Sequence, residues 1–215
     1  MLEIKEVVKK ILFDDEWEGM TQKYTEEDIE EALLTNDALP SIKDILPEDY
    51  KWYMKNYGNR NIDIRNCGFL TKYDESTYLV ASIFNMLEPV GIYRRYSYYT
   101  CTGYDVHRKE EIADANDRLV LELKYMPITN MSVIPGGGMI LMDVKDSIGS
   151  IWRVPPRIDY INSNIDNLTP YFVADNFTEF LKLNESYLGS IAQTIGSEFK
   201  EINKIGSSGI WKKNN

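Results

Sequence analysis

Hydrophobic residues near the start of the chain recur every three to four positions. Ile4, Val7, Val8, Ile11 and Leu12 fall on one side of a helix, and Glu and Lys residues occupy the opposite side. Because this spacing lets a helix bury one face, the pattern predicts an amphipathic helix at the start of the chain.

Start and stop signals predict two more helices in the first third of the chain. Thr25 and Asp28 resemble a capping box, with Asp in place of the usual Glu, so a helix should begin there. Another helix should begin at Leu46 and Pro47, because proline suits the first helical position and acids follow it. Gly58 then provides a natural stop. The apolar stripe of this helix consists of Tyr50, Tyr53, Met54 and Tyr57.

The middle of the chain changes to patterns that are typical of strands. Its apolar segments are rich in β-branched and aromatic residues, which favour the pleated surface of a sheet. Within residues 119–125, Leu and Tyr alternate with Glu and Lys, as in a strand that is buried on one face. Residues 104–118 are polar and fit either a short helix or an inserted loop. The predicted strands are residues 76–84, 91–100, 119–125, 139–144 and 148–154.

Helical spacing returns towards the end of the chain. Asp175 or Asn176 can cap a helix that carries Phe177, Phe180 and Leu181 on one face. Residues 188–202 then show the clearest apolar stripe in the sequence. We therefore expect one α+β domain over residues 1–203, with its core at about 17–185 and a helical extension after it, and a loose tail over residues 204–215.

Charge and composition narrow the classes of function. The 215 residues include 24 Lys and Arg against 34 Asp and Glu, a formal charge of −10. Proteins that bind nucleic acid neutralise phosphates with Lys and Arg, so this balance argues against direct nucleic-acid binding and suits solubility or a basic partner. The first residues lack the apolar core of a signal peptide, and no apolar run reaches the roughly 18 residues that a membrane span needs. We expect a cytoplasmic protein without a membrane partner.

Cysteine and histidine usage limits the chemistry further. His107 is the only histidine, and Cys67 and Cys101 are the only cysteines. A zinc site of the finger type needs four such ligands, so the sequence excludes it. In a reducing cytoplasm the two cysteines should remain thiols. His107 lies in a strongly polar stretch, which favours a solvated surface position over the shielded cleft of a catalytic histidine.

Two other features could suggest a site but have simpler explanations. The triplet at residues 136–138 is three glycines, yet a strand pattern follows it instead of the helix that a phosphate-binding loop requires, so a turn or bulge is favoured. Asp143 and Asp146 could pair in a hydrolase or a divalent-metal site, but turns often produce such pairs. We assign no catalytic residue, cofactor or metal ligand from the sequence.

A tyrosine-rich segment at residues 93–99 is the stronger candidate site. Its aromatic residues alternate with two arginines. Such a segment can stack on bases, can supply the hot spot of a protein interface, or can simply cover one face of a sheet. The charge of −10 ranks a protein partner above nucleic acid. The predicted partner-binding residues are Tyr93, Tyr96, Tyr98 and Tyr99.

Three segments together carry a family resemblance. The first joins the acidic helix at residues 25–31 to residues 46–58, where Leu-Pro precedes a Tyr-containing helix that ends at Asn-Tyr-Gly. In the second, residues 134–152, glycines lead into an apolar strand that ends in an acid, and Gly-Ser-Ile-Trp follows. The third, residues 171–181, contains Phe-x-x-Phe-Leu. In this order the segments resemble the SUKH superfamily, which contains bacterial toxin-immunity proteins and yeast cell-wall assembly regulators.

The resemblance implies both a fold and a function. The implied fold is α+β, with a central antiparallel, partly wrapped sheet and helices from both ends of the chain packed around it. The shared positions are structural, so the resemblance implies no catalytic residue. It implies a non-enzymatic immunity protein that neutralises a cognate toxin, of a basic nuclease type, in a bacterial polymorphic-toxin or contact-dependent system. No oligomeric state follows from it.

Two alternatives belong to other classes of function. One is a regulatory scaffold module of the cell-wall assembly regulator type, without a toxin partner. The other is an enzyme that uses His107, or Asp143 together with Asp146. A large neighbouring gene that ends in a variable toxin domain would favour the immunity role.

Overall fold

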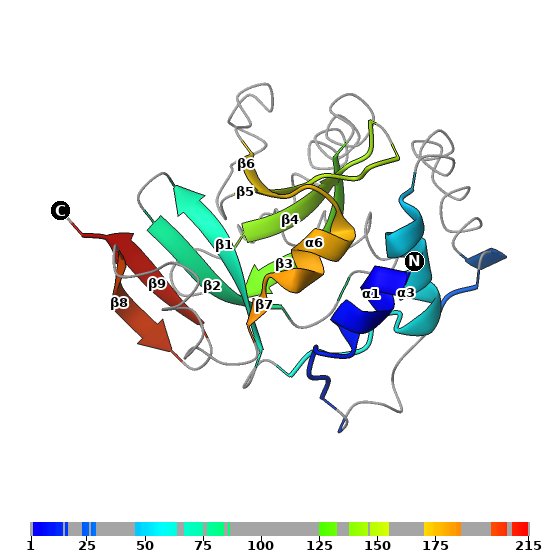
Figure 1. The fold of residues 1–215 in the computed structure, drawn as a ribbon, viewed down its shortest axis with the longest axis horizontal. Helices are drawn as coiled ribbons and strands as arrows, with labels where there is room; N and C mark the ends of the chain where they lie inside the picture. The colour runs from blue at the N-terminus through cyan, green and yellow to red at the C-terminus, as the bar shows by residue number, and fades with distance from the viewer. Residues whose placement is uncertain are drawn as a thin grey trace, which may run out of the picture.

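Helices begin the chain, strands follow, and one short helix precedes the last strands (Figure 1). The computed structural model describes residues 2–14, 16, 23–25, 27–28, 46–63, 67–74, 77–83, 86, 125–132, 138–145, 147–154, 170–185, 199–205 and 208–214. The helices in these ranges are α1 (Leu2–Val8), α3 (Glu48–Asn56) and α6 (Phe177–Lys182). The strands are β1 (Gly68–Asp74), β2 (Thr77–Ile83), β3 (Tyr125–Ser132), β4 (Gly138–Asp143), β5 (Ile151–Val154), β6 (Tyr171–Ala174), β7 (Asn184–Glu185), β8 (Phe199–Ile205) and β9 (Ser208–Lys213).

Antiparallel pairing joins the described strands into one sheet. Their order is β6-β5-β4-β3-β2-β1-β7, and the hairpin of β8 and β9 attaches through β9 to β2. The sheet branches at β2. One edge of this strand pairs with β1, and the other edge pairs with both β9 and β3. Residues 77–80 pair with β9, and residues 82–83 pair with β3. The predicted α+β class with an antiparallel sheet is therefore confirmed.

The three helices pack against the sheet and form the hydrophobic core with it. Figure 1 shows α1, α3 and α6 gathered near the N-terminus, whereas the β8–β9 hairpin and the C-terminus lie at the opposite end. Aromatic side chains fill the centre: the Phe177 ring meets Tyr50 and Tyr53 edge-on at centroid distances of 5.2 and 5.4 Å. Phe180 stacks on Phe69 of β1 at 5.3 Å. The core thus links α3, α6 and the sheet.

The helices predicted at residues 4–12 and 46–58 agree with the structure. In α1, the residues Ile4, Val7 and Val8 are buried, as the spacing requires, while Leu12 beyond the helix is 45% exposed. Pro47 is the N-cap of α3, one position before its expected place. The helix ends at Asn56 with Tyr57 as its C-cap, and Gly58 follows with a left-handed φ of 57° and an N–H that donates to the Tyr53 carbonyl at 3.2 Å.

The predicted capping box is also present. Thr25 N–H donates to Asp28 Oδ2 at 2.7 Å, and Asp28 N–H donates to Thr25 Oγ1 at 3.0 Å. Hydrogen bonds from the backbone and the side chain of Thr25 lower the pKa of the Asp28 carboxyl, because they favour its charged form. The helix expected after residue 28 lies outside the described residues.

The strand predictions succeed for three segments. Residues 76–84 and 148–154 contain β2 and β5, and residues 139–144 coincide with β4 except that the strand begins and ends one residue earlier. Of residues 119–125, only Tyr125 is described, and β3 begins there and runs on to Ser132. Residues 91–100 and 104–118 lie outside the described part of the chain. The sequence patterns did not predict β1 or β6. Of the two predicted caps of α6, Asp175 and Asn176, the structure has Asn176, whose side chain accepts from Glu179 N–H.

The C-terminal region differs from its prediction. Phe199 and Ile202 were expected on a helix and residues 204–215 in a loose tail, but β8 and β9 form a hairpin there. Ile202 is the extra residue of a bulge, since Glu201 pairs with Trp211 and the next pair is Asn203 with Ile210. The bulge disrupts the two-residue period, and the pairing of β9 with β2 is remote in sequence, so a local pattern could not reveal it. Residues 188–198 lie outside the described residues.

Candidate functional site

Most residues that the sequence singled out for chemistry lie outside the described part of the chain. These are Tyr93, Tyr96, Tyr98 and Tyr99, His107, and Asp146. Asp143 is described, and it ends β4, where its carboxylate accepts from Lys145 N–H at 2.9 Å and pairs with Lys145 Nζ at 3.4 Å. Gly138 opens β4, so the glycine triplet does lead into a strand. Asp143 therefore organises the turn after β4.

The described residues offer no obvious centre for metal chemistry. Within them, no three His, Cys, Asp or Glu side chains come together in a way that could hold a metal ion. Cys67 is buried, its thiol donates to the Leu12 carbonyl at 3.5 Å, and burial raises the pKa of that thiol. The neutral form is favoured, which makes the thiol a poor nucleophile. None of the helices in the described ranges has the length and apolar character needed to cross a membrane.

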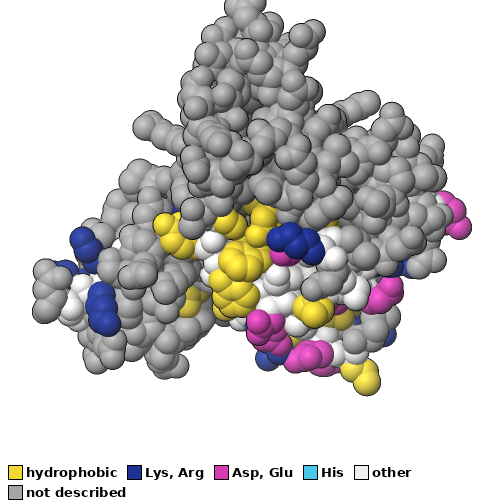
Figure 2. Space-filling view, turned by 90° about the horizontal axis from the view of Figure 1, so that it is seen from above, with side chains coloured by type: hydrophobic (Ala, Val, Ile, Leu, Met, Phe, Trp, Pro, Cys, Tyr) yellow, Lys and Arg dark blue, Asp and Glu magenta, His cyan; other side chains and the backbone are white. Residues whose placement is uncertain are grey.

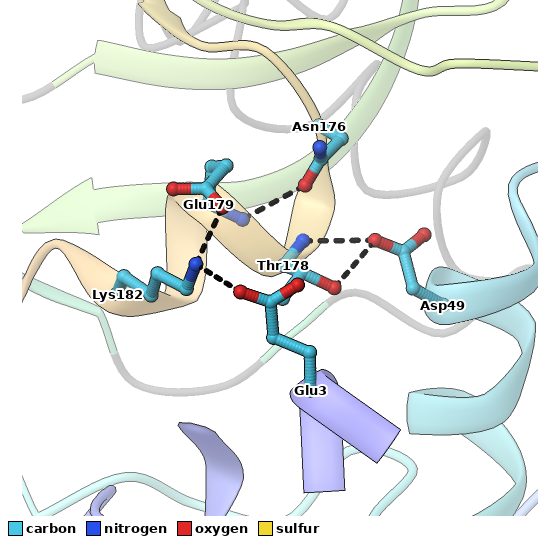
Figure 3. A network of polar contacts seen from close by, with 6 residues as sticks. All are labelled: Glu3, Asp49, Asn176, Thr178, Glu179 and Lys182. Atoms are coloured by element: carbon cyan, nitrogen blue, oxygen red, sulfur yellow. Dashed lines mark hydrogen bonds and ion pairs between the residues drawn. The ribbon is translucent and has the colours of Figure 1, made fainter. Parts of the chain in front are cut away.

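A polar network joins α6 to the two N-terminal helices (Figure 3). Asp49 of α3 accepts two hydrogen bonds at Oδ2, from Thr178 N–H and from Thr178 Oγ1–H, both at 2.8 Å. Asn176 Oδ1 accepts from Glu179 N–H at 2.9 Å and so caps α6 itself. The N–H groups in the first turn of α6 are therefore capped by two side chains, one from the N-cap residue Asn176 and one from Asp49 of α3.

An ion-pair cluster completes this network on the surface. Lys182 donates to Glu179 at 2.5 Å and to Glu3 of α1, so it bridges the two helices. The hydrogen bond and charge of Lys182 lower the pKa of Glu3, and the two carboxylates raise the pKa of Lys182. All three side chains are substantially exposed, so solvent screens their interaction. The network holds helices in place and presents no activated acid or base.

A close backbone approach fixes α3 against the turn before β5. Gly149 has a φ of 69°, and a Cβ atom there would lie 2.3 Å from Pro47 Cγ. Only glycine fits this position, because any larger residue would both strain the backbone and collide with proline. The Leu-Pro and Gly-Ser-Ile-Trp segments thus contact each other, which explains them as structural positions.

The face of the sheet that points away from the helices carries three aromatic side chains. Alternate residues of β3 to β5, including Met126, Ile140 and Ile151, point into the core cluster with the helices. Their neighbours Tyr125 and Trp152 therefore belong to the other face, because successive side chains of a strand alternate. Phe172 of β6 pairs directly with Trp152 and shares its face. We call Tyr125, Trp152 and Phe172 the aromatic row.

The rings of the aromatic row touch in sequence across β3, β5 and β6. Trp152 meets Phe172 edge-on at a centroid distance of 5.5 Å and meets Tyr125 in the same manner at 6.4 Å. Trp152 Nε1–H donates to Ser150 Oγ at 2.9 Å, which fixes the indole. Phe172 is 48% exposed and the other two rings are partly exposed. Figure 2 shows hydrophobic side chains gathered near the middle of the described surface, with charged side chains beside them.

One end of the row bears a cation. Lys145 Nζ lies 4.9 Å from the centroid of the Tyr125 ring, which is a cation–π contact. Partial burial raises the pKa of Tyr125 more than the neighbouring Lys145 lowers it. Aromatic residues are enriched at protein interfaces. The aromatic row, which is partly exposed, is therefore the candidate functional surface of the described residues.

Sequence reasoning missed this surface for a specific reason. Trp152 and Phe172 both lie in segments that carry the family resemblance, and those segments were read as structural. The one available signal was alternation in residues 151–153, where Trp152 stands between residues that turned out to be buried. The contact of three rings depends on the order of β3, β4, β5 and β6, which no local pattern encodes.

A comparison with protein-family models shows the family of this chain. The model of the SMI1/KNR4 family (SUKH-1) matches residues 23–183, well over half of the chain. The chain belongs to the SMI1/KNR4 (SUKH-1) family. The SUKH-1 match ends just after α6, so it includes the aromatic row and leaves the β8–β9 hairpin beyond it. No match was found among curated proteins or among solved structures.

Proposed function

We propose that this SUKH-1 protein is a non-enzymatic immunity protein that binds and neutralises a cognate toxin in the cytoplasm of a bacterium. The observation that carries the proposal is the family match over residues 23–183, since immunity proteins of polymorphic toxin systems are frequent in this family. The toxin would be a basic, nuclease-type domain of a polymorphic-toxin or contact-dependent system.

Charge supports a basic partner. The formal charge of −10 attracts a positively charged domain over distances longer than a contact, and nuclease domains are commonly basic because they bind phosphates. An immunity protein must capture its toxin before the toxin acts, so a fast association rate is useful. Complementary potentials raise that rate more than they raise the affinity.

The use of polar groups supports binding over catalysis. The described side chains that form networks, such as Asp49, Thr178 and Lys182, join helices to one another. Burial raises the pKa of the Tyr50 and Tyr53 hydroxyls, which keeps both neutral. We therefore propose no catalytic residue, no cofactor and no metal for this protein.

A toxin-protection experiment tests the proposed function. The toxin domain encoded next to the gene is expressed in bacteria with and without this protein, and survival is measured. We expect survival only with the protein, and a stable complex of the two purified domains. If the toxin kills equally in both cases and the purified domains do not associate, the immunity role is wrong, and a regulatory scaffold without a toxin partner becomes the better description.

Binding kinetics test the electrostatic part of the proposal and the tyrosine segment. Raising the salt concentration from 0.1 M to 1 M shortens the Debye length from about 10 Å to about 3 Å, so the association rate should fall while dissociation changes less. The sequence-based proposal that Tyr96, Tyr98 and Tyr99 contact the toxin predicts that at least one change to Ala speeds dissociation, with a loss of about 2 kcal/mol.

A further inference from the structure

The described residues contain one surface that packing alone does not explain. On the helix side of β3 to β6, side chains such as Met126, Ile140 and Met142 are buried against the helices and need no other partner. On the other side, Phe172 leaves 48% of its surface in contact with water, next to the partly exposed Trp152. Exposed aromatic rings that adjoin one another, instead of lying singly, are typical of interaction sites.

We propose that the aromatic row of Tyr125, Trp152 and Phe172 is a docking surface for a basic, arginine-containing segment of a protein partner. This inference rests on the proposed function, because it assigns the surface to the toxin. Its residues are not those of the tyrosine segment at residues 93–99, which lies outside the described part of the chain.

The geometry of the row suits a partner that stacks on it. Edge-to-face contacts at 5.5 and 6.4 Å order the three rings, and 48% of the Phe172 surface remains open to a partner. The hydrogen bond from Trp152 Nε1 to Ser150 Oγ satisfies the one polar atom of the indole and holds its orientation. A surface that is already ordered loses little conformational entropy when a partner binds.

Charge identifies the occupant as basic. Lys145 Nζ already lies 4.9 Å from the Tyr125 centroid, so a ring face at one end of the row accepts a cation. Asp143 lies beside it as the carboxylate partner of Lys145, and the chain as a whole carries a charge of −10. Arginine is favoured over lysine, because its planar guanidinium stacks on an aromatic ring and is weakly hydrated.

A titration with simple peptides tests the chemistry of the surface without the toxin. The indole N–H signal of Trp152, assigned from its loss in Trp152→Phe, is followed by NMR while hexaarginine or hexaglutamate is added. We expect a saturable shift with hexaarginine and none with hexaglutamate.

Matched variants localise the binding. Phe172→Ala should raise the Kd of hexaarginine at least about threefold, whereas Leu2→Ala, an exposed apolar residue of α1, should leave it unchanged. Lys145→Ala and Lys9→Ala each remove one positive charge, but only Lys145→Ala frees the Tyr125 ring. We expect Lys145→Ala to bind hexaarginine more tightly than Lys9→Ala does.

Two results would overturn the assignment. One is the absence of a Trp152 shift with hexaarginine, or an equal shift with hexaglutamate. The other is the same affinity in Phe172→Ala and in the unchanged chain, with circular dichroism showing that the variant is folded.

The toxin then separates this inference from the proposed function. If the unchanged chain protects against the toxin and Phe172→Ala binds it at least about tenfold more weakly, both stand. If the chain protects and neither Phe172→Ala nor Tyr125→Ala weakens toxin binding, the surface is wrong and the immunity role is retained. Loss of binding in the variants of residues 96–99 alone would assign the contact to that segment.

Discussion

The two faces of strands β3 to β5 use the same backbone for opposite purposes. On the helix side, Ile140 and Ile151 are fully buried with Phe177 and Phe180 of α6. On the other side, Trp152 pairs with the half-exposed Phe172 of β6 and contacts Tyr125. Neighbouring residues on a strand thus point to opposite faces, as Ile151 and Trp152 do, although the outer face is not exposed throughout, since Leu141 of β4 is fully buried there.

The difference lies in what surrounds the aromatic rings. On the helix side, rings meet several others: Phe177 contacts Tyr50, Tyr53 and Phe180. On the outer side, the contacts among the described residues are those between neighbours in the row and that of Lys145 with Tyr125. The first arrangement stabilises the fold, and the second leaves about half of Phe172 available to a partner. Substitutions on the two faces should therefore change different quantities.

The largest expected effect is on the helix side. Phe180→Ala removes a fully buried ring that stacks on Phe69, so it should lower the free energy of unfolding by about 3–5 kcal/mol. Phe172→Ala is the matched change on the outer face, and it should lower stability by about 1 kcal/mol or less. Urea denaturation of both variants measures this. Similar losses in the two would remove the distinction between the faces.

The next effect concerns the contact between Gly149 and Pro47. In Gly149→Ala, a Cβ atom would meet Pro47 Cγ at 2.3 Å and the backbone would keep a left-handed φ of 69°. Together these should lower stability by about 2–4 kcal/mol. Ser150→Ala, one position on, is the control and should have a smaller effect, although it removes the acceptor of Trp152 Nε1. A Gly149→Ala variant as stable as the unchanged chain would show that the turn and α3 can separate.

Local signals in the sequence were sufficient for elements whose ends are defined by nearby residues. The cap of α6 at Asn176, the capping box of Thr25 and Asp28, and the stop at Gly58 all depend on bonds within a few residues. The same applies to the apolar segments, rich in β-branched and aromatic residues, that predicted β2 and β4. These features were visible because the interactions that create them are local.

Features that depend on remote pairing could not be predicted in this way. The β8–β9 hairpin was taken for a helix and a tail, since Phe199 and Ile202 fit helical spacing and the pairing of Trp211 with Tyr78 of β2 is distant in sequence. The aromatic row has the same origin, because β4 separates β3 from β5 and the register brings the rings together. The candidate surface is therefore a product of topology.

A smaller effect should follow from breaking the link between α3 and α6. Asp49→Ala leaves Thr178 N–H and Oγ1–H without their acceptor in a largely buried place, which should lower stability by about 2 kcal/mol. Asn176→Ala removes the ordinary cap of the same helix and should lower stability by about 1 kcal/mol. Neither change lies on the outer face, so hexaarginine binding should be unaffected in both. Altered peptide binding would mean that the two faces are coupled.

The smallest effect separates ring packing from polar contacts on the helix side. The Tyr53 hydroxyl is buried without a hydrogen-bond partner, while its ring stacks on Tyr57 at 5.5 Å and meets Phe177 edge-on. Tyr53→Phe keeps both ring contacts and removes only the unsatisfied oxygen, so stability should be unchanged or rise by up to about 1 kcal/mol.

Tyr53→Leu is the control for this change, because it removes the ring together with the hydroxyl. We expect it to lower the midpoint of urea denaturation clearly, by the loss of two ring contacts that are each worth about 0.5–1.5 kcal/mol. On the outer face, by contrast, the polar atom of the indole is satisfied, since Trp152 Nε1–H has its acceptor in Ser150. A marked loss of stability in Tyr53→Phe would show that the hydroxyl contributes to the core, and Tyr53 could then no longer be described as stabilising the helix side through its ring alone.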